Sequence, residues 1–192
     1  KRQTTDIGGF FGANINDPEF HELLVRWFEY GCFCPVMRLH GYRWPLQPQY
    51  GTTGGATCVS GAPNEVWSYT DQVCEILSDY LRLRERMLPY ITELMEEAHE
   101  KGTPVMRPLF YDFPEDKESW NVETEYMFGP KVLVKPITDA DARETDVYLP
   151  GGASWTNAWT GETFEGGQKV HVAAPIEQIP LFTRDGYKLP MK

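Results

Sequence analysis

Disulfide-rich and zinc-binding patterns are both absent from this sequence. Its four cysteines are Cys32, Cys34, Cys58 and Cys74, and no two of them are spaced as a CxxC pair. Secreted small domains rely on disulfide frameworks, and structural zinc sites need paired cysteines or histidines at short spacing. We therefore expect reduced, buried thiols in a cytoplasmic protein, and no metal.

Long apolar runs and an excess of basic residues are also missing. No run approaches the roughly 18 apolar residues of a membrane span. The N-terminal letters KRQTTDIGG lack the apolar core of a signal peptide. The formal net charge is -10, whereas a nucleic-acid-binding protein needs a basic face for the phosphates. We expect neither a membrane nor a nucleic acid as partner.

What the sequence does contain is enough apolar material for a packed interior, with 41% hydrophobic and 14% aromatic residues. Asp17-Pro18 is a typical helix start, and Gly31 is placed to end that helix. Residues 33–41, FCPVMRLHG, then form a short apolar run that predicts a buried parallel strand. The stripe predicted to face the core comprises Phe20, Leu23, Leu24, Trp27 and Phe28. A helix followed by a buried strand is typical of α/β folds.

The middle of the chain predicts a long loop followed by helices. Residues 42–67 are rich in Gly, Pro and Thr, and loops of this length are usually functional or disordered. A long helix is expected from Ser68, with a kink or restart at Pro89 and an end before Gly102. Residues 105–111, VMRPLFY, predict another buried strand.

Beyond Phe113 the pattern changes to short β-type segments separated by Gly, Asp and Pro turns, which is typical of an antiparallel β-sandwich. The fold class predicted is therefore α/β followed by all-β, with domains at 1–113 and 114–192. A complete (β/α)₈ barrel takes about 250 residues, so the first domain can supply only its last βα units. We expect the chain to be the C-terminal part of a larger protein.

Arg38 and His40 close the 33–41 run and share one side of the expected strand. The segment TTDIGGF has a similar form, with Asp6 before a Gly-Gly pair and Phe10 after it. Side chains at the carboxyl ends of barrel strands face the active site. An imidazole can donate and accept hydrogen bonds to sugar hydroxyls, and Phe10 or Phe11 offers an apolar face to a pyranose ring. The residues alone leave His40 open as a ligand-binding group, a structural histidine or a metal ligand.

Seven segments together resemble a known family. They follow in the order TTDIGGF, RWFEYG, FCPVMRLHG, LRLRERMLPYI, GTPVMRPLF, EYMFGPKVLVKP and WTNAWTGE. This series resembles the C-terminal third of glycoside hydrolase family 31, a group of α-glucosidases and α-xylosidases. The resemblance implies that 1–113 close a (β/α)₈ TIM barrel and that 114–192 form the proximal C-terminal β-sandwich domain.

The resemblance also implies site residues. His40 matches the family histidine that binds hydroxyls of the terminal sugar, and Asp6 and Phe10 match residues lining the same subsite. Arg38 is carried over as electrostatic support, with a structural ion pair as its alternative. The family's nucleophile and acid/base motifs do not occur in this sequence, so no catalytic residue is expected in it and the chain alone is expected to be inactive. Lys1-Arg2-Gln3 departs from the aromatics that family members carry before TTD.

By this resemblance the parent enzyme is a retaining α-xylosidase without cofactor, acting with the remainder of the catalytic domain on an oligosaccharide or simple glycoside. The alternatives are an α-glucosidase, a non-catalytic carbohydrate-binding fragment, and a transglycosylase or lyase using the same pocket. A homo-oligomer is compatible with the sequence.

Other residues offer competing interpretations. Glu65 is expected to be a solvated loop acid rather than a sugar ligand, and Asp112 to hydrogen bond at a domain interface. Trp44, Trp67 and Tyr69 are expected either to stack on a second sugar or to anchor the long loop by packing.

Overall fold

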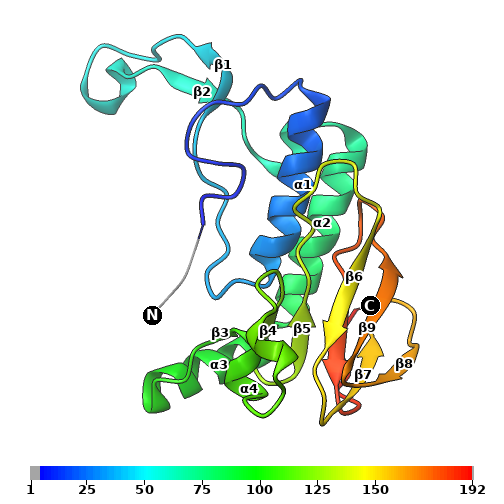
Figure 1. Cartoon of the computed structure of the whole chain (residues 1–192). Coiled ribbons are helices and arrows are strands. Elements are labelled where there is room, and N and C mark those ends of the chain that lie inside the picture. Colours follow the sequence, from blue (N-terminus) through cyan, green and yellow to red (C-terminus); the bar gives the residue numbers. More distant parts are fainter. Residues whose placement is uncertain (1–4, 192) are drawn as a thin grey trace.

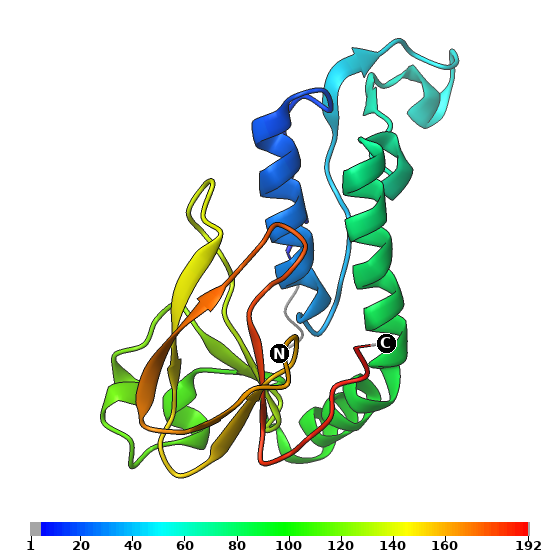
Figure 2. The same cartoon turned by 90° about the vertical axis from the view of Figure 1, so that its right-hand side faces the viewer.

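The computed structural model describes residues 5–191, so Lys1-Arg2-Gln3 lies outside the described part. The molecule is elongated, with a small hairpin at one end and the C-terminal sheets toward the other (Figures 1 and 2). The elements of the first half are α1 (Pro18–Cys32), β1 (Arg43–Gln47), η1 (Gly54–Thr57), β2 (Ser60–Ala62), η2 (Val66–Ser68), α2 (Asp71–Arg86) and α3 (Leu88–Lys101). Among the described helices, none is long and apolar enough to cross a membrane.

Helix α1 begins as predicted. The Asp17 carboxylate accepts a hydrogen bond from the Glu19 backbone N–H at 3.0 Å, with Pro18 in the first turn. Phe20, Leu24 and Phe28 of the predicted stripe are buried in the core shared with α2, but Leu23 is half exposed.

The prediction that Gly31 ends α1 is wrong, because the helix continues to Cys32. Gly31 is buried, and a Cβ there would lie 2.4 Å from Cδ1 of Ile7. The glycine therefore admits the Ile7 side chain against the helix rather than terminating it.

The break between α2 and α3 confirms the restart expected at Pro89, and α3 ends at Gly102 with a left-handed φ of 71°. Helix α2 starts later than Ser68 because the Thr70 hydroxyl accepts from the Val73 N–H. The 42–67 segment contains the β1–β2 hairpin, which projects beyond the helices (Figure 1).

The expected parallel strand at 33–41 is reduced to a single parallel bridge between Ile7 and Leu39. The parallel direction of this pairing agrees with the prediction, but residues 33–41 do not form the predicted strand. A ladder needs neighbouring strands, and within residues 5–191 only Ile7 pairs with this segment.

The expected barrel strand at 105–111 is also wrong. Only Met106–Arg107 is extended, and it pairs antiparallel with a strand of the C-terminal sheet. Pro108, which has no N–H, then precedes a helical turn at Leu109–Asp112.

The second half forms antiparallel sheets, which confirms the predicted pairing. Its elements are β3 (Met106–Arg107), α4 (Leu109–Asp112), η3 (Glu118–Trp120), β4 (Tyr126–Phe128), β5 (Val132–Val134), β6 (Glu144–Leu149), β7 (Ser154–Asn157), β8 (Thr163–Glu165), β9 (Gln168–Ala173) and β10 (Leu181–Arg184). A six-stranded sheet has the order β3-β4-β5-β10-β7-β8, and β6 pairs with β9 separately. Strand β3 precedes residue 113, and the domain boundary drawn there stays a prediction.

At its strand β5, the six-stranded sheet is buried on both faces. Val132 and Val134 belong to the core shared with the helices, whereas Leu133 between them belongs to a second core with Val147 of β6 and Val170 of β9. Alternate residues of a strand point to opposite faces, so the sheet lies between the helices and the β6–β9 pair.

Candidate functional site

The two motif-bearing segments lie side by side in the same direction. The Ile7 N–H donates to the Arg38 carbonyl at 3.2 Å, and the Tyr42 N–H donates to the Phe10 carbonyl at 3.3 Å. Ile7 is fully buried and anchors the first segment beneath α1. This pairing places the residues after TTDIGG beside the residues after Arg38.

Gly41 permits this close approach. Its φ is +105°, and a Cβ there would lie 2.2 Å from the Gly9 carbonyl oxygen and 2.8 Å from that of Phe10. A larger residue would clash with backbone, which cannot rotate away as a side chain can. The position of His40 beside Phe10 thus depends on a glycine at the next residue.

The segment that leads from α1 to His40 is held by two other elements. Arg84 of α2 donates to the carbonyls of Cys32, Cys34 and Pro35 at 2.7, 2.6 and 2.9 Å. Tyr126 of β4 donates its hydroxyl to the Phe33 carbonyl at 3.1 Å. Hydrogen bonds from helix and sheet therefore replace the ladder that the sequence predicted.

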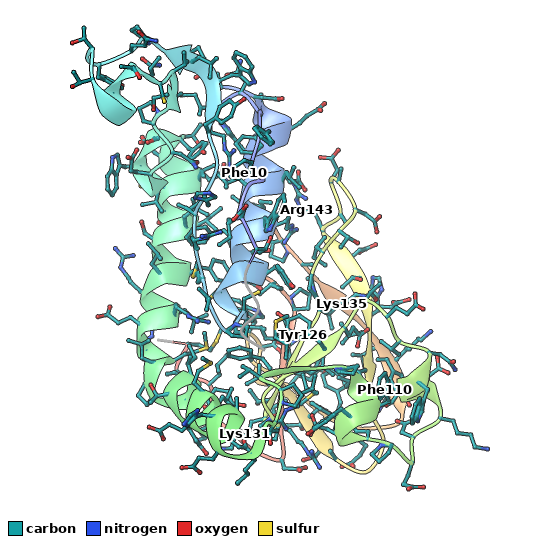
Figure 3. The ribbon with its side chains drawn as sticks, turned by 90° about the vertical axis from the view of Figure 1, so that its left-hand side faces the viewer. Phe10, Phe110, Tyr126, Lys131, Lys135 and Arg143 are labelled. Atoms are coloured by element: carbon teal, nitrogen blue, oxygen red, sulfur yellow. The ribbon has the colours of Figure 1, made fainter. Side chains whose placement is uncertain are left out.

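The four predicted site residues form two contacting pairs on the paired segments. Arg38 forms an ion pair with Oδ1 of Asp6, and the rings of Phe10 and His40 lie 5.4 Å apart between centroids. Asp6 is half-buried, while the other three are exposed. Figure 3 shows Phe10 close to where the hairpin joins the helices.

A shallow, solvent-open cavity of about 570 Å³ lies at this point. Its lining comprises Phe10, Leu39, His40, Gly41, Tyr42, Asn64 and Glu65. Asp6 and Arg38 do not line it. The cavity therefore offers the His40 imidazole and the Phe10 ring to a ligand. The Asp6–Arg38 ion pair lies on the same two segments, outside the cavity lining.

Arg43 is the main feature that the sequence reasoning missed. It is fully buried, and its Nη1 donates to the carbonyls of Gly9 and Tyr42 at 2.9 and 3.0 Å. Longer contacts of 3.4 and 3.5 Å reach the carbonyls of Ile7 and His40. One guanidinium thus binds the backbone of both site segments. No pattern in RWPLQ marks Arg43 as buried, because the next three residues of the strand are all exposed.

The loop acids behave as structural groups. Glu65 reaches the cavity, but it accepts from the Ser68 hydroxyl at 3.0 Å. Hydrogen bonds from its own backbone N–H and from Ser68 lower the pKa of Glu65, so it stays ionised. Asp112 accepts from Arg107 at 3.1 Å, where β3 joins the C-terminal sheet.

The three loop aromatics separate into different environments. Tyr69 is half-buried and donates its hydroxyl to Oδ1 of Asn64 at 2.5 Å. Asn64 in turn donates to the Gly41 carbonyl at 3.3 Å, so Tyr69 supports the site loop. Trp44 and Trp67 are exposed.

The structure holds no set of metal-ligating side chains within residues 5–191. The cysteines are free thiols, with Cys32 and Cys34 buried, Cys74 half-buried and Cys58 exposed, so the expectation of buried thiols fails for Cys58. Burial raises the pKa of Cys32 to about 12, which leaves its thiol protonated and inert.

Comparison with known proteins gives consistent matches along the chain. Residues 2–94 match the glycosyl hydrolases family 31 TIM-barrel domain, and residues 102–189 match the glycosyl hydrolase family 31 C-terminal domain. An α-xylosidase of Saccharolobus solfataricus is 37% identical over 188 residues, covering 98% of this chain and 23% of the relative. Alpha-glucosidase 2 of Bacillus thermoamyloliquefaciens is 36% identical over 182 residues, covering 94% of this chain and 20% of the relative.

A solved structure of a family 31 enzyme also matches this chain. The crystal structure of a family 31 α-xylosidase from a soil metagenome, complexed with xylose, superposes with a TM-score of 0.92 at 48% identity. The match covers 97% of this chain and 28% of that one. The chain thus spans about a quarter of the length of these relatives.

Proposed function

Because the chain belongs to glycosyl hydrolase family 31, we propose that it forms the sugar-binding wall and the C-terminal β-domain of a retaining α-xylosidase. The observation that carries this proposal is the cavity lined by Phe10 and His40, with the Asp6–Arg38 ion pair beside it. These residues come from segments far apart in the sequence and meet at one place. In this proposal residues 1–113 are the last βα units of the (β/α)₈ barrel, and 114–192 are the β-sandwich.

Each side chain has a role that its chemistry supports. The His40 ring nitrogens donate to and accept from sugar hydroxyls, and the Phe10 ring covers the apolar face of a pyranose. Arg38 engages Oδ1 of Asp6, and within the described chain no group bonds Oδ2. That oxygen remains to accept a hydrogen bond from a sugar hydroxyl, while Arg38 fixes the orientation of the carboxylate.

Xylose is the proposed terminal sugar. It is supported by the α-xylosidase name of the Saccharolobus solfataricus relative and by the xylose complex of the metagenomic enzyme. Glucose is the second candidate, supported by the 36% identity to the Bacillus α-glucosidase. For either activity, we also propose the cytoplasmic location that the sequence indicates.

The bond-cleaving groups belong, in this proposal, to the remainder of the catalytic domain. A retaining glycosidase uses two carboxyl groups about 5–5.5 Å apart, one as nucleophile and one as acid/base. A groove of about 790 Å³ between α1 and residues 123–141 offers a surface for that remainder, next to Tyr126 (Figure 3). Leu23 in this groove is 52% exposed on α1, which explains its departure from the predicted core stripe. We propose that a preceding part of the barrel covers it.

Titration of the chain with xylose and with glucose, followed by NMR, tests the site. We expect saturable binding of xylose, and about tenfold weaker binding by His40→Ala, because the variant loses one or two hydrogen bonds of about 1 kcal/mol each. His99→Ala is the matched control, since His99 is an exposed histidine on α3. Equal affinities of the two variants for xylose would reject the role of His40.

A further inference from the structure

The side-chain amide of Asn64 lines the cavity in a fixed orientation. Its Nδ2 donates to the Gly41 carbonyl at 3.3 Å, and its Oδ1 accepts from the Tyr69 hydroxyl at 2.5 Å. A carbonyl oxygen can only accept, so the amide atom that faces Gly41 must be the nitrogen. A flipped amide would set two oxygens against each other at Gly41. The two partners therefore fix which end of the amide is the donor.

Tyr69 holds Asn64 from outside the cavity lining. The Tyr69 ring centroid lies 6.2 Å from that of Phe20 and 5.7 Å from that of His21, so the ring packs on α1. Burial raises the pKa of the Tyr69 hydroxyl, which keeps its proton available for donation. Helix α1 thus sets the position of Tyr69, and Tyr69 sets the orientation of the Asn64 amide.

One N–H of Asn64 is left for a ligand. An amide nitrogen carries two N–H donors, and within residues 5–191 the Gly41 carbonyl is the only acceptor bonded to Nδ2. His40 lines the same cavity, and its ring makes no hydrogen bond in the described part of the chain. The cavity therefore presents one oriented donor from Asn64 and one imidazole that can donate or accept.

We propose that Asn64 is a specificity-determining residue for the terminal sugar and that Tyr69 is its positioning residue. The free Asn64 N–H donates to one hydroxyl oxygen of the sugar, while the His40 ring bonds another hydroxyl. The inference rests on the proposed function, which supplies the sugar, and it adds a requirement for a hydroxyl at one ring position. A site built to bond a hydroxyl rejects analogues that lack it, because its own polar group is left unpaired.

NMR titration of the chain with methyl α-xyloside and its three monodeoxy analogues tests the role of Asn64. We expect Asn64→Ala to weaken binding of methyl α-xyloside about 3- to 10-fold. One deoxy analogue should bind the wild-type chain more weakly by the same factor, because it lacks the hydroxyl that Asn64 bonds. For that analogue, wild type and Asn64→Ala should bind equally, which also shows that the variant is folded. Asn121→Ala is the matched control, since Asn121 is an exposed asparagine after η3.

The side-chain amide signals of Asn64 test the role of Tyr69. In the wild-type chain, methyl α-xyloside should shift the signal of one Nδ2 proton more than the other. Tyr69→Phe keeps the ring that packs on α1 but removes the hydroxyl. We expect it to change both Asn64 amide signals before any sugar is added and to weaken binding about 2- to 5-fold. Unchanged amide signals in Tyr69→Phe would overturn its positioning role.

The outcomes separate this inference from the proposed function. Equal affinities of Asn64→Ala and Asn121→Ala for methyl α-xyloside overturn the role of Asn64, and so does an Asn64→Ala effect that is the same for all three analogues. The sugar site of the proposed function survives either result if His40→Ala still weakens binding. A chain that binds neither xylose nor methyl α-xyloside rejects the site and the inference together.

Discussion

Arg43 is a buried cation whose hydrogen-bond partners are backbone carbonyls. The contacts to Gly9, Tyr42, Ile7 and His40 spread its charge over several carbonyl dipoles, and its guanidinium carbon lies 5.1 Å from the Phe20 ring centroid. Burial of a charge is expensive unless hydrogen bonds replace its water. The two site segments supply those bonds, so their conformation and the position of Arg43 depend on each other.

Replacing Arg43 should destabilise the protein strongly. We expect Arg43→Ala to lower the free energy of unfolding by about 3 kcal/mol or more, because buried carbonyls lose their donor. Arg43→Lys should recover only part of this, since an ammonium lacks the planar fork. Urea denaturation measures both. Arg82→Ala is the control and should change stability by less than about 0.5 kcal/mol, since its pair with Asp79 is exposed. A similar effect of both alanine variants would contradict the stabilising role of the Arg43 hydrogen bonds to the two site segments.

At the scale of elements, glycines decide where the site segments can lie. Gly31 lets Ile7 contact α1, and Gly41 lets the loop after Arg38 contact the Gly9 carbonyl. Both act through missing side-chain volume, and Gly41 also through its positive φ. These effects belong to contacts between elements, because nothing in the local sequence distinguishes these glycines from ordinary helix or turn glycines.

Gly41→Ala and Gly102→Ala form a matched pair. Both positions have a positive φ, but a Cβ at Gly102 meets nothing within 4 Å, whereas at Gly41 it meets backbone at 2.2 Å. We expect Gly102→Ala to cost about 1 kcal/mol of stability from strain alone. Gly41→Ala should cost about 2 to 3 kcal/mol more and broaden or shift the NMR signals of His40 and Phe10. Equal losses in urea denaturation would show that the clash is relieved without disturbing the site.

At the scale of the whole molecule, a buried polar cluster joins the helices to the C-terminal half. Arg26 of α1 donates to the carbonyls of Ala174 and Pro175 at 2.7 and 3.1 Å and to Glu29 at 3.1 Å. Tyr80 of α2 donates to the Glu29 carboxyl group at 3.1 Å and accepts from the Ile179 N–H at 3.0 Å. The cluster therefore fixes the β-domain relative to the helices that carry the site.

Glu29 gives this junction a pH dependence. Burial raises the pKa of Glu29 from 4.5 to about 8, despite the nearby Arg26. The folded protein then keeps a proton that the unfolded chain releases above pH 4.5, so stability falls as pH rises from about 5 to about 8. Tyr80, Cys32 and Glu177 are the other ionisable groups around it.

Urea denaturation at several pH values checks this expectation. Relative to wild type, Glu29→Gln should show a smaller fall in the free energy of unfolding as pH rises from 5 to 8. Burial also raises the pKa of Glu125 to about 7. The fall in stability with rising pH that Glu125 contributes should therefore persist in the variant. Parallel pH profiles of the two proteins would rule out titration of Glu29.

The sequence by itself determined the features that depend on neighbouring residues. Local chemistry was enough for the start of α1 at Asp17-Pro18, the restart at Pro89 and the antiparallel character of the second half. A continuous string of residues was enough for the family motifs around Asp6 and His40. The helix end at Gly31 and the strands at 33–41 and 105–111 were predicted wrongly, because each depends on a distant partner. Only the tertiary structure decided that Ile7 occupies the space at Gly31, that β3 pairs with β4, and that Arg43 binds the carbonyls of both site segments. Such contacts join residues far apart along the chain, and no local pattern specifies which backbone groups will meet.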